Sequence, residues 1–289
     1  MSTTILSILS GIVGMFGWGT YDFLGGVFAK QVGPFKSFFW SQLAGLVSVL
    51  LLAFVFATSS HVPVLIIILF PIAAILYSVG YLFFFKGLEI GNISIVAATM
   101  NLWAVFTMLF AFVFMGQRLS TIQTVGVVMI ICGAALASLN WTDLRKQEYR
   151  LSAGVKEAVL GAFFFGIFWN ISQVISKQVG WLWTTLFVKF GIVLFLLVFS
   201  LRAKREIGLT RTATKTKYVF VLMGVIEAGA VAAVNYGLTI GDAILITPIA
   251  SALSIVTITL AIIFLKDKIT KPQGLGIVTA ISGIIVTAL

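Results

Sequence analysis

Three ionisable residues stand inside long apolar segments of the sequence, where an unpaired charge is costly. Lys189 and Glu227 each lie near the middle of such a segment, and Asp22 lies about six residues from the end of another. A charged side chain at the centre of a bilayer costs about 2.5–3.5 kcal/mol on insertion scales, so each needs a partner, a cavity or a proton. Counted from the segment ends, Lys189 and Glu227 are expected at similar depth.

Two interpretations of Lys189 and Glu227 stay open. They form a structural ion pair, or one or both face a cavity in which Glu227 meets a substrate amine or a coupling proton. Asp22 shares a stripe of helical spacing with Trp18 and Gly25, and it lies close to Lys30. It is interpreted either as a solvated or capping carboxylate or as a gating or coupling residue.

Aromatic and amide side chains form a second group of candidates. Tryptophan usually lies at the bilayer interface, so a tryptophan in the middle of an apolar segment indicates a protein-facing position. Aromatic walls with a few polar groups are typical of small-molecule pockets. The alternative is ordinary packing and hydrogen bonding between helices. The cavity candidates are Tyr77, Tyr81, Asn101, Trp103, Trp169, Asn170, Gln173, Lys189, Glu227 and Asn235.

The elements that must position these residues are membrane-spanning helices. Hydrophobic residues make up 60% of the 289 residues, charged residues 10%, and the mean hydropathy is +1.14. A soluble domain carries about 25% charged residues, and apolar runs of about 18 residues indicate membrane spans. We expect an all-α integral membrane protein with ten spans, at 5–28, 34–57, 63–86, 92–115, 120–139, 153–176, 181–201, 217–238, 243–265 and 272–288.

The basic residues are distributed very unequally between the two sides of the expected membrane. The side of the N-terminus, side A, holds Arg118 and Lys177, whereas sixteen of the other Lys and Arg residues fall on the opposite side B, with Lys189 inside a span. The positive-inside rule therefore places side B, with the connections 140–152 and 202–216, in the cytoplasm. Basic residues confined to short loops do not indicate a nucleic-acid partner.

The sequence contains an internal repeat. A shift of 150 residues places Gly87 on Gly237, Gln123 on Gln273 and Gly126 on Gly276, and a shift of 147 places Gly14 on Gly161 and Gly19 on Gly166. We expect a first five-helix repeat over 1–139, a cytoplasmic linker over 140–152 and a second repeat over 153–289. Because five is an odd number of spans, the repeats must be inverted, an arrangement common in transporters.

These motifs resemble the drug/metabolite transporter superfamily, in particular its ten-span EamA-type exporters. The resemblance is carried by Trp18-Gly19, by the Gly-Leu-x-x-Gly joints that begin at Gly87 and Gly237, and by the stretches 117–126 and 267–276. Gln117 stands where that family usually has Glu. The resemblance implies alternating access around a central cavity lined by spans 1–4 and 6–9, with spans 5 and 10 outside. It also implies cytoplasmic termini, whereas the charge count places both termini outside.

Spans 5 and 10 carry small residues at helical spacing, which is typical of packing surfaces between membrane helices. The sequence has no HExxH, GxSxG or Walker A motif and no Cys/His cluster, so neither an enzyme nor a cofactor or metal is expected. We expect a secondary transporter in a prokaryotic inner or plasma membrane, exporting or exchanging amino acids or similar metabolites. Sugars, nucleobases and lipophilic cations stay open as substrates, and a channel and a membrane scaffold as functions. Protons are a candidate coupling ion, and a monomer is expected to suffice for transport.

Overall fold

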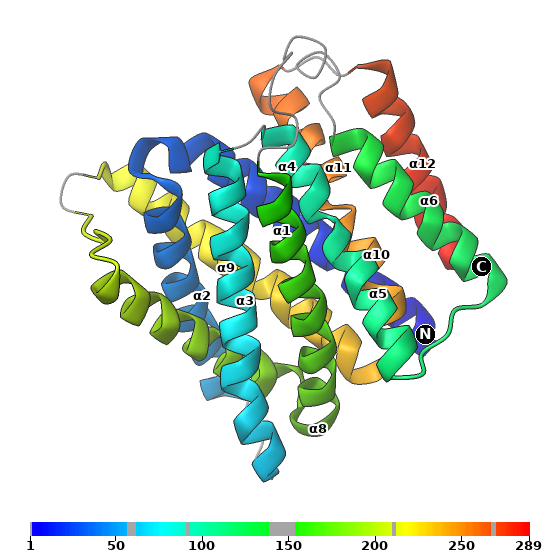
Figure 1. The fold of residues 1–289 in the computed structure, drawn as a ribbon, viewed down its shortest axis with the longest axis horizontal. Coiled ribbons are helices and arrows are strands. Elements are labelled where there is room, and N and C mark those ends of the chain that lie inside the picture. The colour runs from blue at the N-terminus through cyan, green and yellow to red at the C-terminus, as the bar shows by residue number, and fades with distance from the viewer. Residues whose placement is uncertain (1, 57–61, 91–92, 139–153, 210–211, 267–269) are drawn as a thin grey trace.

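The structure of this protein is a computed structural model, which describes residues 2–56, 62–90, 93–138, 154–209, 212–266 and 270–289. All regular elements of these ranges are helices (Figure 1). They are α1 (Thr3–Val32), α2 (Pro34–Phe56), α3 (Val64–Ile90), α4 (Ile93–Met100), α5 (Leu102–Phe114), α6 (Thr121–Ser138), α8 (Val155–Arg202), α9 (Thr214–Ile240), α10 (Ala243–Ser251), α11 (Leu253–Leu260), the π-helical turn η1 (Ala261–Leu265) and α12 (Lys271–Thr287).

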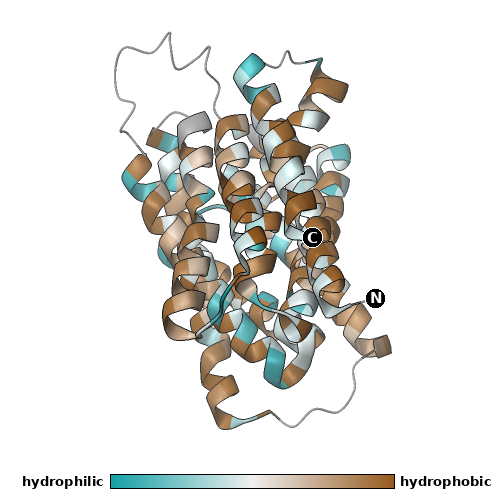
Figure 2. Cartoon of the chain, turned by 90° about the vertical axis from the view of Figure 1, so that its right-hand side faces the viewer, coloured by the Kyte–Doolittle hydropathy of each residue, from teal (hydrophilic) through white to brown (hydrophobic). Residues whose placement is uncertain are grey.

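The apolar runs of the sequence form these helices. Within the described ranges, eight helical segments are long and apolar enough to cross a membrane. Large apolar side chains are turned outward along them, for example Phe54, which is 94% exposed, and Phe114, which is 79% exposed. Figure 2 shows apolar residues along the outward-facing length of the bundle. In water this surface would be a liability, so the chain is a multi-pass integral membrane protein.

One segment of the eight, α8, is interrupted in the middle. Its 48 residues include Gly180, whose φ of 80° and ψ of 165° are not helical. Figure 1 shows the two parts of α8, which we call its first and second legs, meeting at the lower end of the molecule. Two further interruptions occur at related places in the two halves, between α4 and α5 at Asn101 and between α10 and α11 at Ala252.

The two halves of the chain interleave, because most packed helix pairs take one member from each half. Thus α3 packs on α8, α1 and α2 pack on α9, and α6 packs on α12 (Figure 1). Between α6 and α12 the small-residue stripes face each other. A methyl group on Gly126 would lie 2.7 Å from the carbonyl oxygen of Gly283, and one on Gly133 would lie 2.6 Å from that of Gly276. The expectation that these stripes are packing surfaces is confirmed.

Candidate functional site

A cavity of about 330 Å³ lies in the middle of the bundle, between helices of both halves. Its described lining comes from α1, α3, the interrupted pair α4–α5, α11, the first leg of α8, and the ends of α6 and α12. The lining residues are Trp18, Asp22, Tyr77, Tyr81, Phe84, Ala97, Met100, Asn101, Trp103, Ser138, Phe165, Trp169, Leu253, Ser254, Thr257, Ile258 and Gln273.

Three tryptophans from three helices meet at the inner part of this cavity. The ring centroid of Trp18 lies 5.3 Å from that of Trp169 and 6.1 Å from that of Trp103, and the last two are 6.0 Å apart. All three side chains are buried. Tyr77 and Tyr81, with ring centroids 5.0 Å apart, continue the aromatic wall along α3. A site built this way offers large flat apolar surfaces to a ligand.

Asp22 brings a carboxylate to the aromatic wall. It lies one helical turn beyond Trp18 on the same face of α1, and its side chain is exposed. Among the side chains that the structure describes, which do not include that of Lys30, no Lys, Arg or His lies at ion-pair distance from it. Helix α1 runs on to Val32, so Asp22 does not cap a helix end. In the described part of the structure, Asp22 faces the cavity, whose wall includes the rings of Trp18 and Tyr81.

The predicted site residues divide into two groups. Six of them line the cavity together: Asp22, Tyr77, Tyr81, Asn101, Trp103 and Trp169. The other five lie outside its lining and bond to other residues: Asn170, Gln173, Lys189, Glu227 and Asn235. The lining also differs from the expected set of helices. It takes Ser138 and Gln273 from α6 and α12, and nothing from α2, α9 or the second leg of α8.

Lys189 and Glu227 form an ion pair behind the cavity wall. Both side chains are buried, at 1% and 0% exposure. The Lys189 ammonium also donates to Gln42 Oε1 at 2.8 Å, and the Tyr77 hydroxyl donates to Glu227 Oε1 at 2.7 Å. We call these four residues the axial cluster. Tyr77 belongs to it and to the cavity lining, so it separates the ion pair from the cavity.

Two amides outside the cavity join helices to each other. Asn235 on α9 accepts a hydrogen bond from Ser172 Oγ at 2.8 Å and donates to Thr185 Oγ1 at 2.9 Å, so it ties α9 to both legs of α8. Asn170 donates to the carbonyl oxygen of Thr107 at 3.1 Å and thereby joins α8 to α5. These contacts match the interhelical hydrogen bonding that the sequence left open as the alternative to substrate binding.

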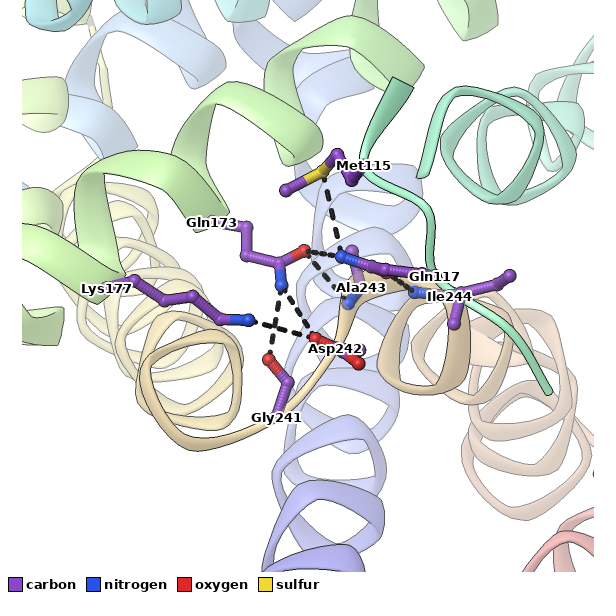
Figure 3. A network of polar contacts seen from close by, with 8 residues as sticks. All are labelled: Met115, Gln117, Gln173, Lys177, Gly241, Asp242, Ala243 and Ile244. Carbon is purple, nitrogen blue, oxygen red and sulfur yellow. Dashed lines mark hydrogen bonds and ion pairs between the residues drawn. The ribbon is translucent and has the colours of Figure 1, made fainter. Parts of the chain in front are cut away.

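A second polar network lies at the side A ends of the helices. There the α5–α6 connection, the first leg of α8 and the α9–α10 turn meet (Figure 3). Gln117 Nε2 donates to Gln173 Oε1 at 2.8 Å, and Gln173 Nε2 donates to Asp242 Oδ1 at 3.1 Å. Lys177 forms an ion pair with Asp242 at 2.9 Å. We call Gln117, Gln173, Lys177 and Asp242 the glutamine cluster.

The glutamine cluster satisfies the start of helix α10. The first backbone N–H groups of any helix lack partners within it. Here the Ala243 N–H donates to Gln173 Oε1 and the Ile244 N–H donates to Gln117 Oε1, each at 3.1 Å (Figure 3). Gln117 comes from the first half of the chain and the other partners from the second. The two halves are therefore joined at this end by hydrogen bonds.

Several residues of the cavity lining and the axial cluster were not among the predicted site residues, including Trp18, which the sequence placed only in the stripe with Asp22. Gln42 is a lone amide in an apolar segment, a signal that could have identified it. Ser254 and Thr257 share a face at a spacing of three residues, a second usable signal. The sequence context of Phe84, Phe165 and Gln273 does not distinguish them from residues that only pack between helices or cap a helix. They line the cavity because of where their helices cross.

The fold defines a polytopic helical membrane protein with a cavity between its two halves. The family model described as EamA-like transporter family matches twice, at residues 5–139 and 152–289. The chain therefore belongs to the EamA-like transporter family, whose members are membrane transporters of small solutes. A solved crystal structure, described only as that of a protein, aligns with a TM-score of 0.80 at 16% identity, covering 97% of this chain and 95% of that one. That likeness supports the fold alone. No curated protein matches the chain.

Proposed function

We propose that this protein is a secondary transporter that moves a small organic solute by alternating access, with the aromatic cavity as its substrate site. The observation that carries the proposal is a cavity between the two repeats whose side A end is closed by hydrogen bonds between the repeats. The glutamine cluster holds the side A ends of the helices together. The lining extends the other way, to Phe84, Ser138 and Gln273 near the side B ends of α3, α6 and α12.

The proposed topology has ten spans in two inverted five-helix repeats. It is supported by the double family match, by the break at Gly180, which divides α8 into two segments, and by α12, whose 17 residues almost cross the hydrocarbon. The paired interruptions at Asn101 and Ala252 add to this, because both border the cavity. Discontinuous helices at the interface between repeats are a recurrent feature of transporter binding sites.

The conformation described here is, on this proposal, the one open to side B. The distribution of Lys and Arg assigns side B to the cytoplasm, which makes this an inward-facing state. A solute would then bind from the cytoplasm, and the glutamine cluster would open to release it outside. This direction corresponds to an exporter or an exchanger of amino acids or similar amines. A channel is disfavoured, because one end of the cavity is closed by direct hydrogen bonds.

Flux in proteoliposomes tests the transporter proposal. The purified protein, in a Cys132→Ser background, is assayed for saturable uptake and counterflow with amino acids, amines, sugars and nucleobases. Cysteines are then placed at Gln117 and Gln173 and joined by a short bifunctional thiol reagent. We expect saturable counterflow of one class, lost on cross-linking and kept in each single-cysteine variant treated alike. Undiminished flux through the cross-linked protein would contradict alternating access, and absence of saturable flux would contradict transport.

A further inference from the structure

We propose that the cavity selects monovalent organic cations, that is, amines or quaternary ammonium compounds with a flat apolar body. The inference rests on the proposed function and narrows its substrate class. It excludes amino acids, which carry a carboxylate beside the ammonium group. It comes from one carboxylate, Asp22, that has no described counter-charge and stands in a lining whose other described members are aromatic, apolar or uncharged polar residues.

The charge of the lining points to a cation. Of the described residues that line the cavity, Asp22 alone carries a formal charge, and neither Lys nor Arg is among them. The buried cation that lies nearest in the fold, Lys189, is paired with Glu227 behind Tyr77 and is only 1% exposed. It therefore cannot serve as a counter-charge for a ligand carboxylate. A single positive charge on the ligand would balance the site.

The aromatic wall suits the same kind of ligand. Trp18 precedes Asp22 by one helical turn. The ring centroids of Trp103 and Trp169 lie 6.1 Å and 5.3 Å from the ring centroid of Trp18. A cation placed within about 6 Å of an indole face is attracted by the ring quadrupole, most strongly where water is excluded. The carboxylate supplies charge and the tryptophans supply both polarisable faces and apolar area. Together they recognise an ammonium group attached to an aromatic or alicyclic body.

Zwitterions and sugars fit the lining less well. A ligand carboxylate would find no Lys or Arg in the described lining, and two of the polar lining groups are already bonded to the protein. Asn101 donates to Ser138 Oγ at 3.2 Å, and Thr257 donates to the carbonyl oxygen of Gly19 at 3.0 Å. A sugar would leave most of its hydroxyl groups against aromatic carbon, where unpaired polar groups are costly.

Four compounds that share a phenethyl body separate these classes. They are 2-phenylethylamine (a cation), 2-phenylethanol (neutral), phenylalanine (a zwitterion) and phenylacetate (an anion). Binding to the full-length protein in detergent is measured by quenching of intrinsic tryptophan fluorescence, since three of the tryptophans line the cavity. Uptake into proteoliposomes is measured with the trimethylated amine, whose fixed charge prevents leakage, and with phenylalanine.

We expect the amine to bind about tenfold or more tightly than the other three compounds. Asp22→Asn should remove that preference while leaving the weak binding of 2-phenylethanol unchanged. Glu206→Gln is the matched control, because it makes the same carboxylate-to-amide change at a side chain that is 88% exposed. Saturable uptake of the trimethylated cation should be lost in Asp22→Asn and kept in Glu206→Gln.

Three outcomes would overturn the inference, and they differ in what they say about transport. If phenylalanine binds and is taken up as well as the amine, or if Asp22→Asn keeps the preference for the amine, cation selection is wrong and the transporter proposal stands. If neither compound binds or shows saturable uptake, while the broad panel in the flux assay succeeds with another class, the substrate class is wrong. If that panel also fails, both proposals fall.

Discussion

The hydroxyl group of Tyr77 donates a 2.7 Å hydrogen bond to Glu227, and the two residues are 150 positions apart. A shift of 150 is also the one that places span 3 on span 8 in the internal repeat, so Tyr77 and Glu227 occupy equivalent positions in the two halves. The same holds for Gln42 and Lys189, which are 147 positions apart and joined by a 2.8 Å hydrogen bond. A shift of 147 relates spans 1 and 6, and it also carries the start of span 2, at 34, to the start of span 7, at 181.

Two contacts of the axial cluster, Tyr77–Glu227 and Gln42–Lys189, therefore join equivalent positions, whereas its ion pair, Lys189–Glu227, joins unlike positions. If the two inverted repeats exchange conformations during transport, each residue takes over the surroundings of its equivalent in the other repeat. A contact between two equivalent residues is then kept, whereas a contact between residues that are not equivalent is replaced by a different one. The hydrogen bonds Tyr77–Glu227 and Gln42–Lys189 are therefore expected to persist in both states. The glutamine cluster joins unlike positions, since Gln117 is equivalent to Asp267 by the shift of 150, and is expected to break.

Loss of one partner of the axial cluster should destabilise the protein strongly. Glu227→Gln leaves the Lys189 ammonium buried without a counter-charge, which typically costs about 3–5 kcal/mol of stability. Tyr77→Phe removes a single hydrogen bond to a charged group and should cost about 1.5–3 kcal/mol. Thermal unfolding in detergent measures both. Replacing both charges, by Lys189→Met with Glu227→Leu, should cost less than Glu227→Gln alone, and equal or greater loss would contradict the pairing argument.

The two clusters should differ in their effect on the balance between states. With Ser254→Cys as a reporter in the cavity of a Cys132→Ser background, labelling by a membrane-impermeant maleimide reports access from each side. Gln173→Ala removes the hydrogen bonds to Asp242 and to the start of α10, so labelling from side A should rise several-fold. Tyr77→Phe should lower stability without changing the ratio of labelling from the two sides. A shift of that ratio in Tyr77→Phe would argue against a contact common to both states.

The contact between α6 and α12 should not tolerate a larger residue. Gly133→Leu would force a side chain into the backbone of α12, because even a methyl group there would lie 2.6 Å from the Gly276 carbonyl oxygen. Overpacking of this kind costs about 1–3 kcal/mol or more. Gly229→Leu is the control, since no atom lies within 4 Å of a methyl group at that helical position. Equal melting temperatures for the two variants would show that the stripes do not carry the packing.

Gly180 should be required for its backbone conformation alone. Its φ of 80° and ψ of 165° lie in a region reached almost only by glycine, although open space surrounds its Cα. Gly180→Ala should therefore destabilise the protein by about 1–3 kcal/mol. Gly229→Ala, in a regular helix with equal space, should instead be neutral or stabilise by about 0.5–1 kcal/mol. Equal free energies of unfolding for Gly180→Ala and Gly229→Ala would exclude backbone strain at Gly180.

The sequence by itself determined the membrane class, the positions of the apolar segments, the repeat and the small-residue stripes. These follow from local composition and from glycines at helical spacing, and tertiary contacts change none of them. Six of the predicted site residues line one cavity, and Trp18, which was not predicted as a site residue, lies there with Trp103 and Trp169.

Only the tertiary structure decided which polar residues face the cavity and which face each other. Hydropathy does not fix the rotation of a helix that is apolar on all sides, because no face is preferred by composition alone. Lys189 and Glu227 meet Gln42 and Tyr77 across 147 and 150 residues, and no local signal announces a contact over such a distance. The ion pair satisfies its own charges in the interior, and Asp22 is thereby left as the charged group of the described cavity lining.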